Sequence, residues 1–166
     1  MYKAYTGIGS RKTPIEICNL MTKLAIKLQT LGYTLRSGHA DKADQAFEAG
    51  VSHSWLKEIY IPWPGFNGSY SRFDNPSEEA YELAKRFHPN WGACSQGAKA
   101  LHARNGHQLL GEKLITPSEF VLCWTQDGKA SGGTGQAMRI AEHYGIPVFN
   151  MHNPENIRRI TEFLKG

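Results

Sequence analysis

The chain has 166 residues, with 19 lysines and arginines against 15 aspartates and glutamates, which gives a formal net charge of +4 at pH 7. This length corresponds to one domain with a sizeable core, and no apolar run approaches the roughly 20 residues that a membrane-spanning helix needs. Basic and acidic residues are interleaved, unlike the dense basic stripe of a protein that binds duplex DNA. The charge permits an anionic ligand or a nucleic-acid single strand without requiring either. Three widely spaced cysteines and the lack of a signal peptide predict a reduced, cytoplasmic protein with no membrane partner.

Short apolar runs alternate with amphipathic segments along the chain. The pattern predicts strands at residues 2–7, 33–36, 59–61, 120–124 and 147–150. It predicts helices at residues 14–31, 41–51, 77–87, 96–110, 133–144 and 154–164, and a long aromatic loop at residues 63–75. Strands that alternate with helices in this way predict a single α/β domain over residues 1–166. We expect a Rossmann-like, doubly wound, mainly parallel sheet with helices on both faces.

A first glycine-rich turn follows the first predicted strand. A glycine turn that opens a helix exposes unpaired backbone N–H groups at the positive end of the helix dipole, which suits an anionic oxygen. The candidate ligand-binding residues here are Gly7, Gly9, Ser10 and Arg11. Because Lys12 stands where the dinucleotide fingerprint has its third glycine, a standard nicotinamide site is not expected. The alternative is a tight turn with Arg11 in water.

The second strand-to-helix junction contains another set of polar candidates. Arg36 ends the strand, and Ser37 and Gly38 offer backbone donors. We expect Asp41 to cap the following helix. Asp44 lies one turn further on, where it either accepts ribose hydroxyl groups or holds the loop by hydrogen bonds.

A second glycine-rich turn follows the strand at residues 120–124. Three glycines and a threonine at a helix start offer backbone and hydroxyl donors, and we predict a functional loop rather than a flexible surface loop. The candidate ligand-binding residues are Gly132, Gly133, Thr134, Gly135 and Gln136.

Two further groups of residues have alternative interpretations. Arg104 and Asn105 are polar in an otherwise apolar segment, so they either line the pocket or brace its loops. The aromatic side chains of the middle loop either stack on a base or form a satellite hydrophobic cluster. These aromatic residues are Trp63, Phe66, Tyr70 and Phe73.

No metal and no cofactor are expected. The chain has seven histidines but contains no HExxH or CxxC motif. His102 and His107 are five residues apart, which is the wrong spacing for one face of a helix.

Three segments together resemble the SLOG superfamily, a Rossmann-like group that contains the DNA-processing protein DprA/Smf and the Lonely Guy (LOG) nucleoside-monophosphate hydrolases. GIGSRKTP at residues 7–14 is similar to the opening G-S-R-x-x-T/P run of DprA-type domains. RSGHADKADQAFEAG at residues 36–50 resembles S-G-x-A-x-G-x-D, and SGGTGQA at residues 131–137 resembles the G-G-x-G-T loop of LOG proteins. The pattern is most similar to small DprA-like proteins of bacteriophage genomes. The resemblance implies nucleotide binding.

The chain departs from these patterns at two places. Lys42 stands where the second segment usually has glycine. The glutamate that follows the threonine in LOG proteins has no counterpart, since Gln136 and Arg139 occupy the last two positions of that motif. The missing glutamate argues against cleavage of the LOG type.

Three functions are consistent with these observations. The first is binding of a nucleotide or a nucleotide-derived small molecule by a sensor or sequestering protein, which in a phage would act in the host cytoplasm, for example in counter-defence. The second is an N-glycosidase or phosphoribohydrolase, in which Asp44 or Glu48 supplies the catalytic carboxylate, because the two lie one helical turn apart. The third is DprA-like binding of single-stranded DNA in recombination. A homo-oligomer is also expected, because the aromatic loop and the helix at residues 96–110 have no obvious covering element.

Overall fold

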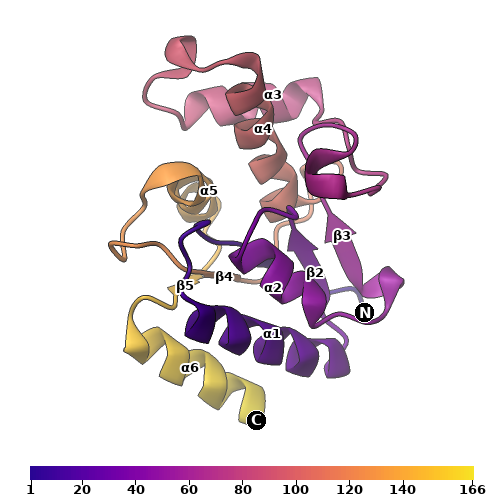
Figure 1. Ribbon diagram of the computed structural model, residues 1–166, viewed down its shortest axis with the longest axis vertical. Coiled ribbons are helices and arrows are strands. Elements are labelled where there is room, and N and C mark those ends of the chain that lie inside the picture. Colours follow the sequence, from indigo (N-terminus) through magenta and orange to yellow (C-terminus); the bar gives the residue numbers. More distant parts are fainter.

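The computed structural model describes residues 1–166 and contains a five-stranded, entirely parallel sheet with the strand order β3-β2-β1-β4-β5 (Figure 1). The strands are β1 (Ala4–Gly7), β2 (Thr34–Ser37), β3 (Lys57–Ile59), β4 (Val121–Cys123) and β5 (Val148–Asn150). This sheet confirms the predicted α/β, doubly wound, Rossmann-like fold. The order reverses between β1 and β4, and the carboxyl ends of strands at such a point are where open α/β sheets bind ligands.

Six helices and three short 3-10 turns connect the strands. The helices are α1 (Ile15–Thr30), α2 (Ala43–Ala49), α3 (Glu78–Arg86), α4 (Gln96–Leu110), α5 (Gly132–His143) and α6 (Pro154–Lys165). The 3-10 turns are η1 (Ser54–Leu56), η2 (Phe66–Gly68) and η3 (Trp91–Ala93). The element bounds agree with the sequence prediction to within two residues in most cases. No helix of the structure combines the length and the apolar character that crossing a bilayer would require.

The helices cover both faces of the sheet, each over its own apolar cluster. On one face, α1, α2 and α6 pack on side chains of β1, β2 and β4, around the fully buried Phe47. On the other face, α5 and the C-terminal end of α4 pack on β4, around Ile140 and Leu109. The α3–α4 pair then extends beyond the sheet, as the upper part of Figure 1 shows. The loops at the carboxyl ends of the strands therefore lie between the helices on one face of the sheet and those on the other.

Local sequence signals set the helix ends correctly in two cases and wrongly in one. Ser77 caps α3 by accepting a hydrogen bond from the N–H of Ala80, and Asn153 caps α6. The prediction that Asp41 caps α2 was wrong. The cap position is taken by Lys42, which has a φ of 72°, and no side chain caps this helix. Lys42 therefore adopts the left-handed backbone conformation that favours glycine, the residue expected there from the SLOG resemblance.

Candidate functional site

A cavity of about 560 Å³ lies at the carboxyl ends of β1, β2 and β4. Its wall is formed by the β1–α1 turn, the β2–α2 turn, η2, one side of α4 and the β4–α5 turn. The cavity is of the size that holds a small molecule. It therefore occupies the place where a sheet of this strand order is expected to bind a ligand.

The structure brings many of the sequence-predicted site residues together in this cavity. Those that line it are Gly9, Ser10, Arg11, Asp44, Arg104, Asn105, Gly132, Gly133 and Thr134. The remaining candidates are not among the residues that line it: Gly7, Arg36, Ser37, Gly38, Glu48, Gly135 and Gln136. Gly38 and Gln136 nevertheless hydrogen-bond side chains that do line the cavity, Arg104 and Asn105 respectively.

The β1–α1 turn contributes two basic side chains to the cavity. Arg11 and Lys12 are both exposed, and neither side chain forms an ion pair or a hydrogen bond within the chain. A guanidinium group without a partner in the chain can form two parallel charge-assisted hydrogen bonds to one phosphate or carboxylate. The two side chains thus make one side of the cavity receptive to an anion.

The N-terminus of α5 forms the opposite side of the cavity. The backbone N–H groups of Gly132, Gly133 and Thr134 make no hydrogen bond, and the side chain of Ser131 does not cap the helix. A Cβ atom on Gly133 would meet no atom within 4 Å, so the backbone here stands in open space. Unpaired N–H groups at the positive end of a twelve-residue helix attract negative charge.

Asp44 is the buried acid of the cavity, with only 3 % of its surface exposed. Its carboxylate accepts a hydrogen bond from the backbone N–H of Ala40 (3.4 Å), and the backbone N–H groups of Gly38 and Gly9 favour its charged form. Burial raises the pKa of this carboxyl to about 6, although the positive charge of Arg104 and the three N–H donors oppose the shift. A carboxyl with such a pKa can hold or release a proton near neutral pH.

Arg104 is the buried basic residue of the cavity, with 6 % of its surface exposed. Its Nη1 donates to the carbonyl oxygens of Gly38 (2.7 Å) and Tyr60 (3.0 Å), and its guanidinium lies over the ring of Phe66 at 5.4 Å. Burial lowers the pKa of Arg104, and the nearby carboxylate of Asp44 opposes this shift. The arginine thus braces two loops and also lines the cavity, so both alternative interpretations of this residue apply.

Polar side chains of α4 that face the cavity are incompletely hydrogen-bonded. Asn105 donates to Gly133 O (3.2 Å) and to Gln136 Oε1 (2.9 Å) and accepts from Gln108 Nε2 (2.9 Å). Four buried side-chain nitrogen or oxygen atoms of the whole chain have no partner, and three of them belong to cavity residues on α4. These are His102 Nδ1, Arg104 Nε and Gln108 Oε1. Unpaired buried polar atoms are rare in folded proteins, so their concentration in one cavity indicates that a polar ligand belongs there.

Arg36 does not take part in this cavity, contrary to the sequence-based expectation. It is 1 % exposed, and its guanidinium forms an ion pair with Glu58 (3.3 Å) and donates to the carbonyl of Thr116 (2.6 Å) and to the hydroxyl of Tyr2 (3.0 Å). All of these bonds lie away from the strand ends that line the cavity, so Arg36 stabilises the sheet.

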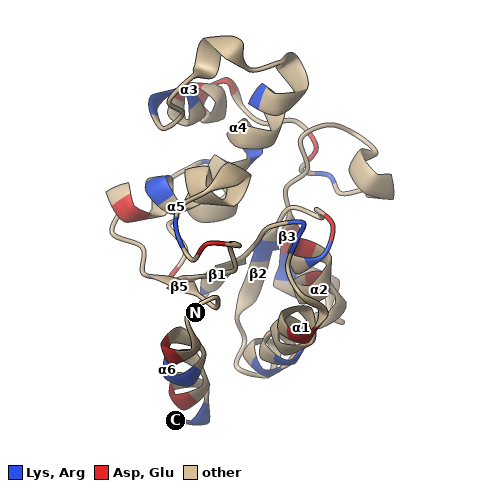
Figure 2. Cartoon of the chain, turned by 60° about the vertical axis from the view of Figure 1, so that its left-hand side comes forward, with Lys and Arg blue, Asp and Glu red and all other residues tan.

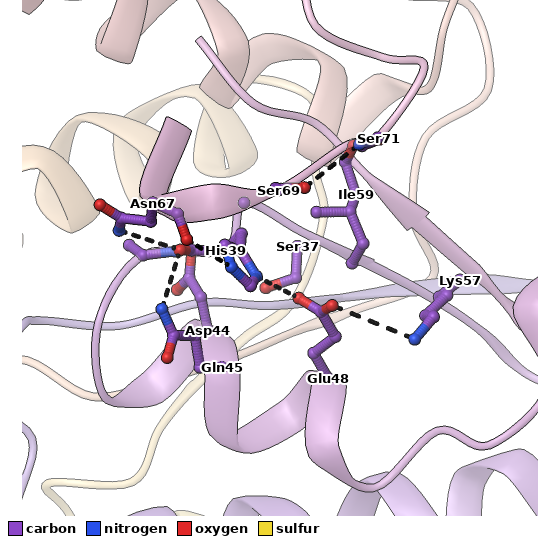
Figure 3. A network of polar contacts seen from close by, with 12 residues as sticks. Ser37, His39, Asp44, Gln45, Glu48, Lys57, Ile59, Asn67, Ser69 and Ser71 are labelled. Carbon is purple, nitrogen blue, oxygen red and sulfur yellow. Dashed lines mark hydrogen bonds and ion pairs between the residues drawn. The ribbon is translucent and has the colours of Figure 1, made fainter. Parts of the chain in front are cut away.

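Glu48 is also separated from the cavity, although it lies one turn beyond Asp44. Its carboxylate contacts His39 Nδ1 at 2.8 Å and Lys57 Nζ at 4.0 Å, as Figure 3 shows. His39 in turn is held by Asn67 of η2, which donates from Nδ2 to the carbonyl of His39. Glu48 therefore anchors the β2–α2 turn instead of facing a ligand.

The side chains of the aromatic loop differ in role: some line the cavity and others form a hydrophobic cluster. Phe66 lines the cavity, edge-on to Trp63, whereas Phe73 packs against Tyr60 with ring centroids 4.7 Å apart. Tyr70 is 98 % exposed and is not among the residues that line the cavity. Only Phe66 is therefore placed to stack on a bound ring.

Several cavity residues were missed by the sequence analysis. The most informative is Gln108 of α4, which lies at the spacing of one helix face from Leu101 and from the predicted Arg104, and all three line the cavity. That spacing would have identified Gln108. Lys12 lies next to Arg11 in the first glycine-rich turn and Thr125 follows β4, so their positions could have identified them, whereas only tertiary structure brings Asn67 of η2 to the cavity.

The chain was compared with protein-family models, with curated proteins and with solved structures. None of the three comparisons finds a match.

Proposed function

We propose that this protein binds a nucleotide or a nucleotide-derived small molecule in the cavity between the β1–α1 and β4–α5 turns. The observation that carries the proposal is the concentration of unpaired buried polar atoms on the cavity side of α4, opposite an uncapped helix N-terminus. A ligand with both anionic oxygens and a polar ring satisfies the two features together. The resemblance of the same turns to SLOG proteins supports this ligand class.

The proposed binding mode divides the ligand between the walls of the cavity. Phosphate oxygens accept hydrogen bonds from the N–H groups of Gly132 and Gly133 and from the free guanidinium of Arg11. Asp44 accepts hydroxyl groups of the ribose. The base lies against Phe66; in proteins that bind single-stranded nucleic acid, such stacking contributes about 1–3 kcal/mol per base.

A second candidate function is cleavage of the ligand's N-glycosidic bond, and one observation favours it. The carboxyl of Asp44 lies in the cavity with its pKa raised to about 6 by burial, which suits a group that transfers a proton near neutral pH. Glu48, the other proposed carboxylate, is engaged by His39 and Lys57. The hydrolase hypothesis therefore rests on Asp44 alone.

Binding of single-stranded DNA has weaker support. Figure 2 shows Lys and Arg interspersed with Asp and Glu along α1 and α6, instead of forming one continuous basic track. A DprA-like function would require affinity that falls steeply with salt concentration.

The test is a thermal-shift screen against mononucleotides, ADP-ribose, nicotinamide dinucleotides and cyclic nucleotides, followed by chromatography of each ligand that raises the melting temperature. Recovery of the intact ligand supports a sensor or sequestering protein, and recovery of free base with sugar phosphate supports a hydrolase. We expect Arg11→Gln to weaken binding about 10- to 100-fold, because a charge-assisted bond contributes about 1.5–3 kcal/mol. Arg86→Gln, an exposed arginine of α3 outside the cavity, is the matched control.

Two results would contradict the proposal. One is that no nucleotide changes the melting temperature. The other is that Arg11→Gln and Arg86→Gln have the same affinity for every ligand found. Salt-dependent binding of a labelled oligonucleotide in place of these ligands would favour the DNA-binding alternative.

A further inference from the structure

Three potential metal ligands meet outside the motifs that the sequence analysis considered. His88 follows α3, Cys94 follows η3, and His102 lies in the second turn of α4. Their ligand atoms all lie within 4.8 Å of one another, and all three side chains are half-buried. The rings of His88 and His102 are 4.6 Å apart at their centroids, with an interplanar angle of 65°.

One distance within the cluster matches that between two ligands of a small tetrahedral ion. Zinc binds thiolate sulphur at about 2.3 Å and imidazole nitrogen at about 2.0 Å, so sulphur and nitrogen ligands of a tetrahedral zinc ion lie about 3.5 Å apart. The distance from Cys94 Sγ to His88 Nε2 is 3.5 Å. Two imidazoles and one thiolate form a mixed N/S donor set of the kind that zinc takes.

One of the unpaired polar atoms of the cavity also belongs to this cluster. His102 Nδ1 is buried and has no hydrogen-bond partner. A neutral imidazole with a free nitrogen is the form that coordinates a metal.

We propose that His88, Cys94 and His102 bind one zinc ion, which links the segment between α3 and α4 to the wall of the cavity. Most residues of this segment are exposed, including Pro89, Asn90 and Gly92, so little apolar burial holds it in place. An ion shared with His102 fixes the segment to α4. Because His102 also lines the cavity, the ion stands at the edge of the proposed nucleotide site.

The coordination leaves one position open. Three protein ligands complete only part of a tetrahedral shell, and the fourth position is taken by water or by an added ligand, as in catalytic zinc sites. Binding requires loss of the thiol proton from Cys94, so it releases a proton to solution and weakens at acid pH.

Cobalt(II) is the probe for the site, because it replaces zinc and is coloured. Full-length protein is treated with a chelator, returned to metal-free buffer and titrated with Co²⁺, without any nucleotide. We expect one cobalt ion per chain, a thiolate-to-cobalt charge-transfer band and the visible bands of tetrahedral cobalt, all lost when one equivalent of Zn²⁺ is added. Zinc should also raise the melting temperature of the wild-type protein, since it binds the folded chain.

Cys94→Ser and His88→Gln are the test variants, and His53→Gln is the matched control. His53 is exposed and lies just before η1, outside the cluster. Cys94→Ser should lose the charge-transfer band and the zinc-dependent rise in melting temperature, while its metal-free melting temperature stays at the wild-type value. His88→Gln should lose the tetrahedral bands, and His53→Gln should keep both signals.

Two results would overturn the proposal. One is the absence of a charge-transfer band and of stoichiometric zinc binding by the wild-type protein, which would leave Cys94 and His88 as a hydrogen-bonded pair. The other is equal metal binding by Cys94→Ser and the wild type. Neither result bears on nucleotide binding, which is tested separately with metal-free protein and Arg11→Gln.

Discussion

The β1–α1 turn and the β4–α5 turn carry similar glycine patterns but differ in what the glycines do. A Cβ atom on Gly7 would lie 2.7 Å from Cγ of Phe47, and one on Gly9 would lie 2.6 Å from the Cβ of Ala43, so β1 and its turn pack directly on α2. A Cβ atom on Gly132 or Gly133 would meet nothing within 4 Å. A Cβ atom on Gly135 would lie 2.2 Å from the carbonyl carbon of Ala130. The first turn is therefore closely packed, whereas the second is open at Gly132 and Gly133.

The backbone N–H groups of the two turns differ in the same way. In the β1–α1 turn, Ile8 and Ser10 donate to carbonyl oxygens of Leu122 and Trp124. Those of Gly132 and Gly133 are unpaired. The packed turn therefore offers a ligand chiefly the side chains of Arg11 and Lys12, whereas the open turn offers its backbone.

Gly7→Ala is the largest expected change, and it tests the packed turn. The added methyl group collides with the fully buried ring of Phe47, so we expect the free energy of unfolding to fall by about 3 kcal/mol. Urea unfolding followed by circular dichroism measures this change. A loss smaller than about 0.5 kcal/mol, the usual effect of a surface substitution, would show that α2 moves away easily and that the turn is not closely packed.

Asp44 provides the next test, since its buried carboxyl lines the cavity together with the packed turn. Burial raises its pKa from 3.8 to about 6, so the folded chain binds this proton more tightly than the unfolded chain does. The stability gained from the proton is complete below about pH 3.8 and is lost as the pH rises through about 6. Relative to Asp44→Asn, the wild type should therefore lose about 3 kcal/mol of unfolding free energy over this interval.

The measurement is urea unfolding of both proteins at a series of pH values across that interval. Asp44→Asn has no titrating group at this position, so it supplies the reference for all other groups of the chain. Parallel pH profiles for the wild type and the variant would show that the pKa of Asp44 is not raised in the folded protein.

The fold could be predicted from the sequence because it depends on local patterns. Alternating strands and helices, the cap at Ser77 and the Asn153-Pro154 pair each act within a few residues. The predicted cap of α2 was wrong because Lys42, not Asp41, precedes the helix. Lys42 has the left-handed backbone conformation, in which a lysine is not expected.

The site could be predicted only where its residues belong to strand-to-helix turns. Arg36 ends a strand as a ligand-binding residue would, but its partner Thr116 is 80 residues away, and no local pattern reveals that bond. Glu48 shares a helix face with Asp44, yet His39 of the preceding turn occupies its carboxylate. The cluster of His88, Cys94 and His102 could not be predicted for the same reason. It joins three separate segments without a spacing motif.

Gly133→Ala is the smallest expected change in stability, and it tests the open turn. The new methyl group meets no atom of the chain, so we expect the free energy of unfolding to change by no more than about 0.5 kcal/mol. The methyl group stands among the unpaired N–H groups and hinders a bound anion, which should weaken nucleotide binding about 3- to 10-fold, the equivalent of about one hydrogen bond. Gly97→Ala is the matched control, because Gly97 is also the second residue of its helix but does not line the cavity. Calorimetric titration should then separate the two variants while urea unfolding does not. Equal affinities for the two would mean that the ligand avoids α5, and that the anion is held by Arg11 and Lys12 of the packed turn instead.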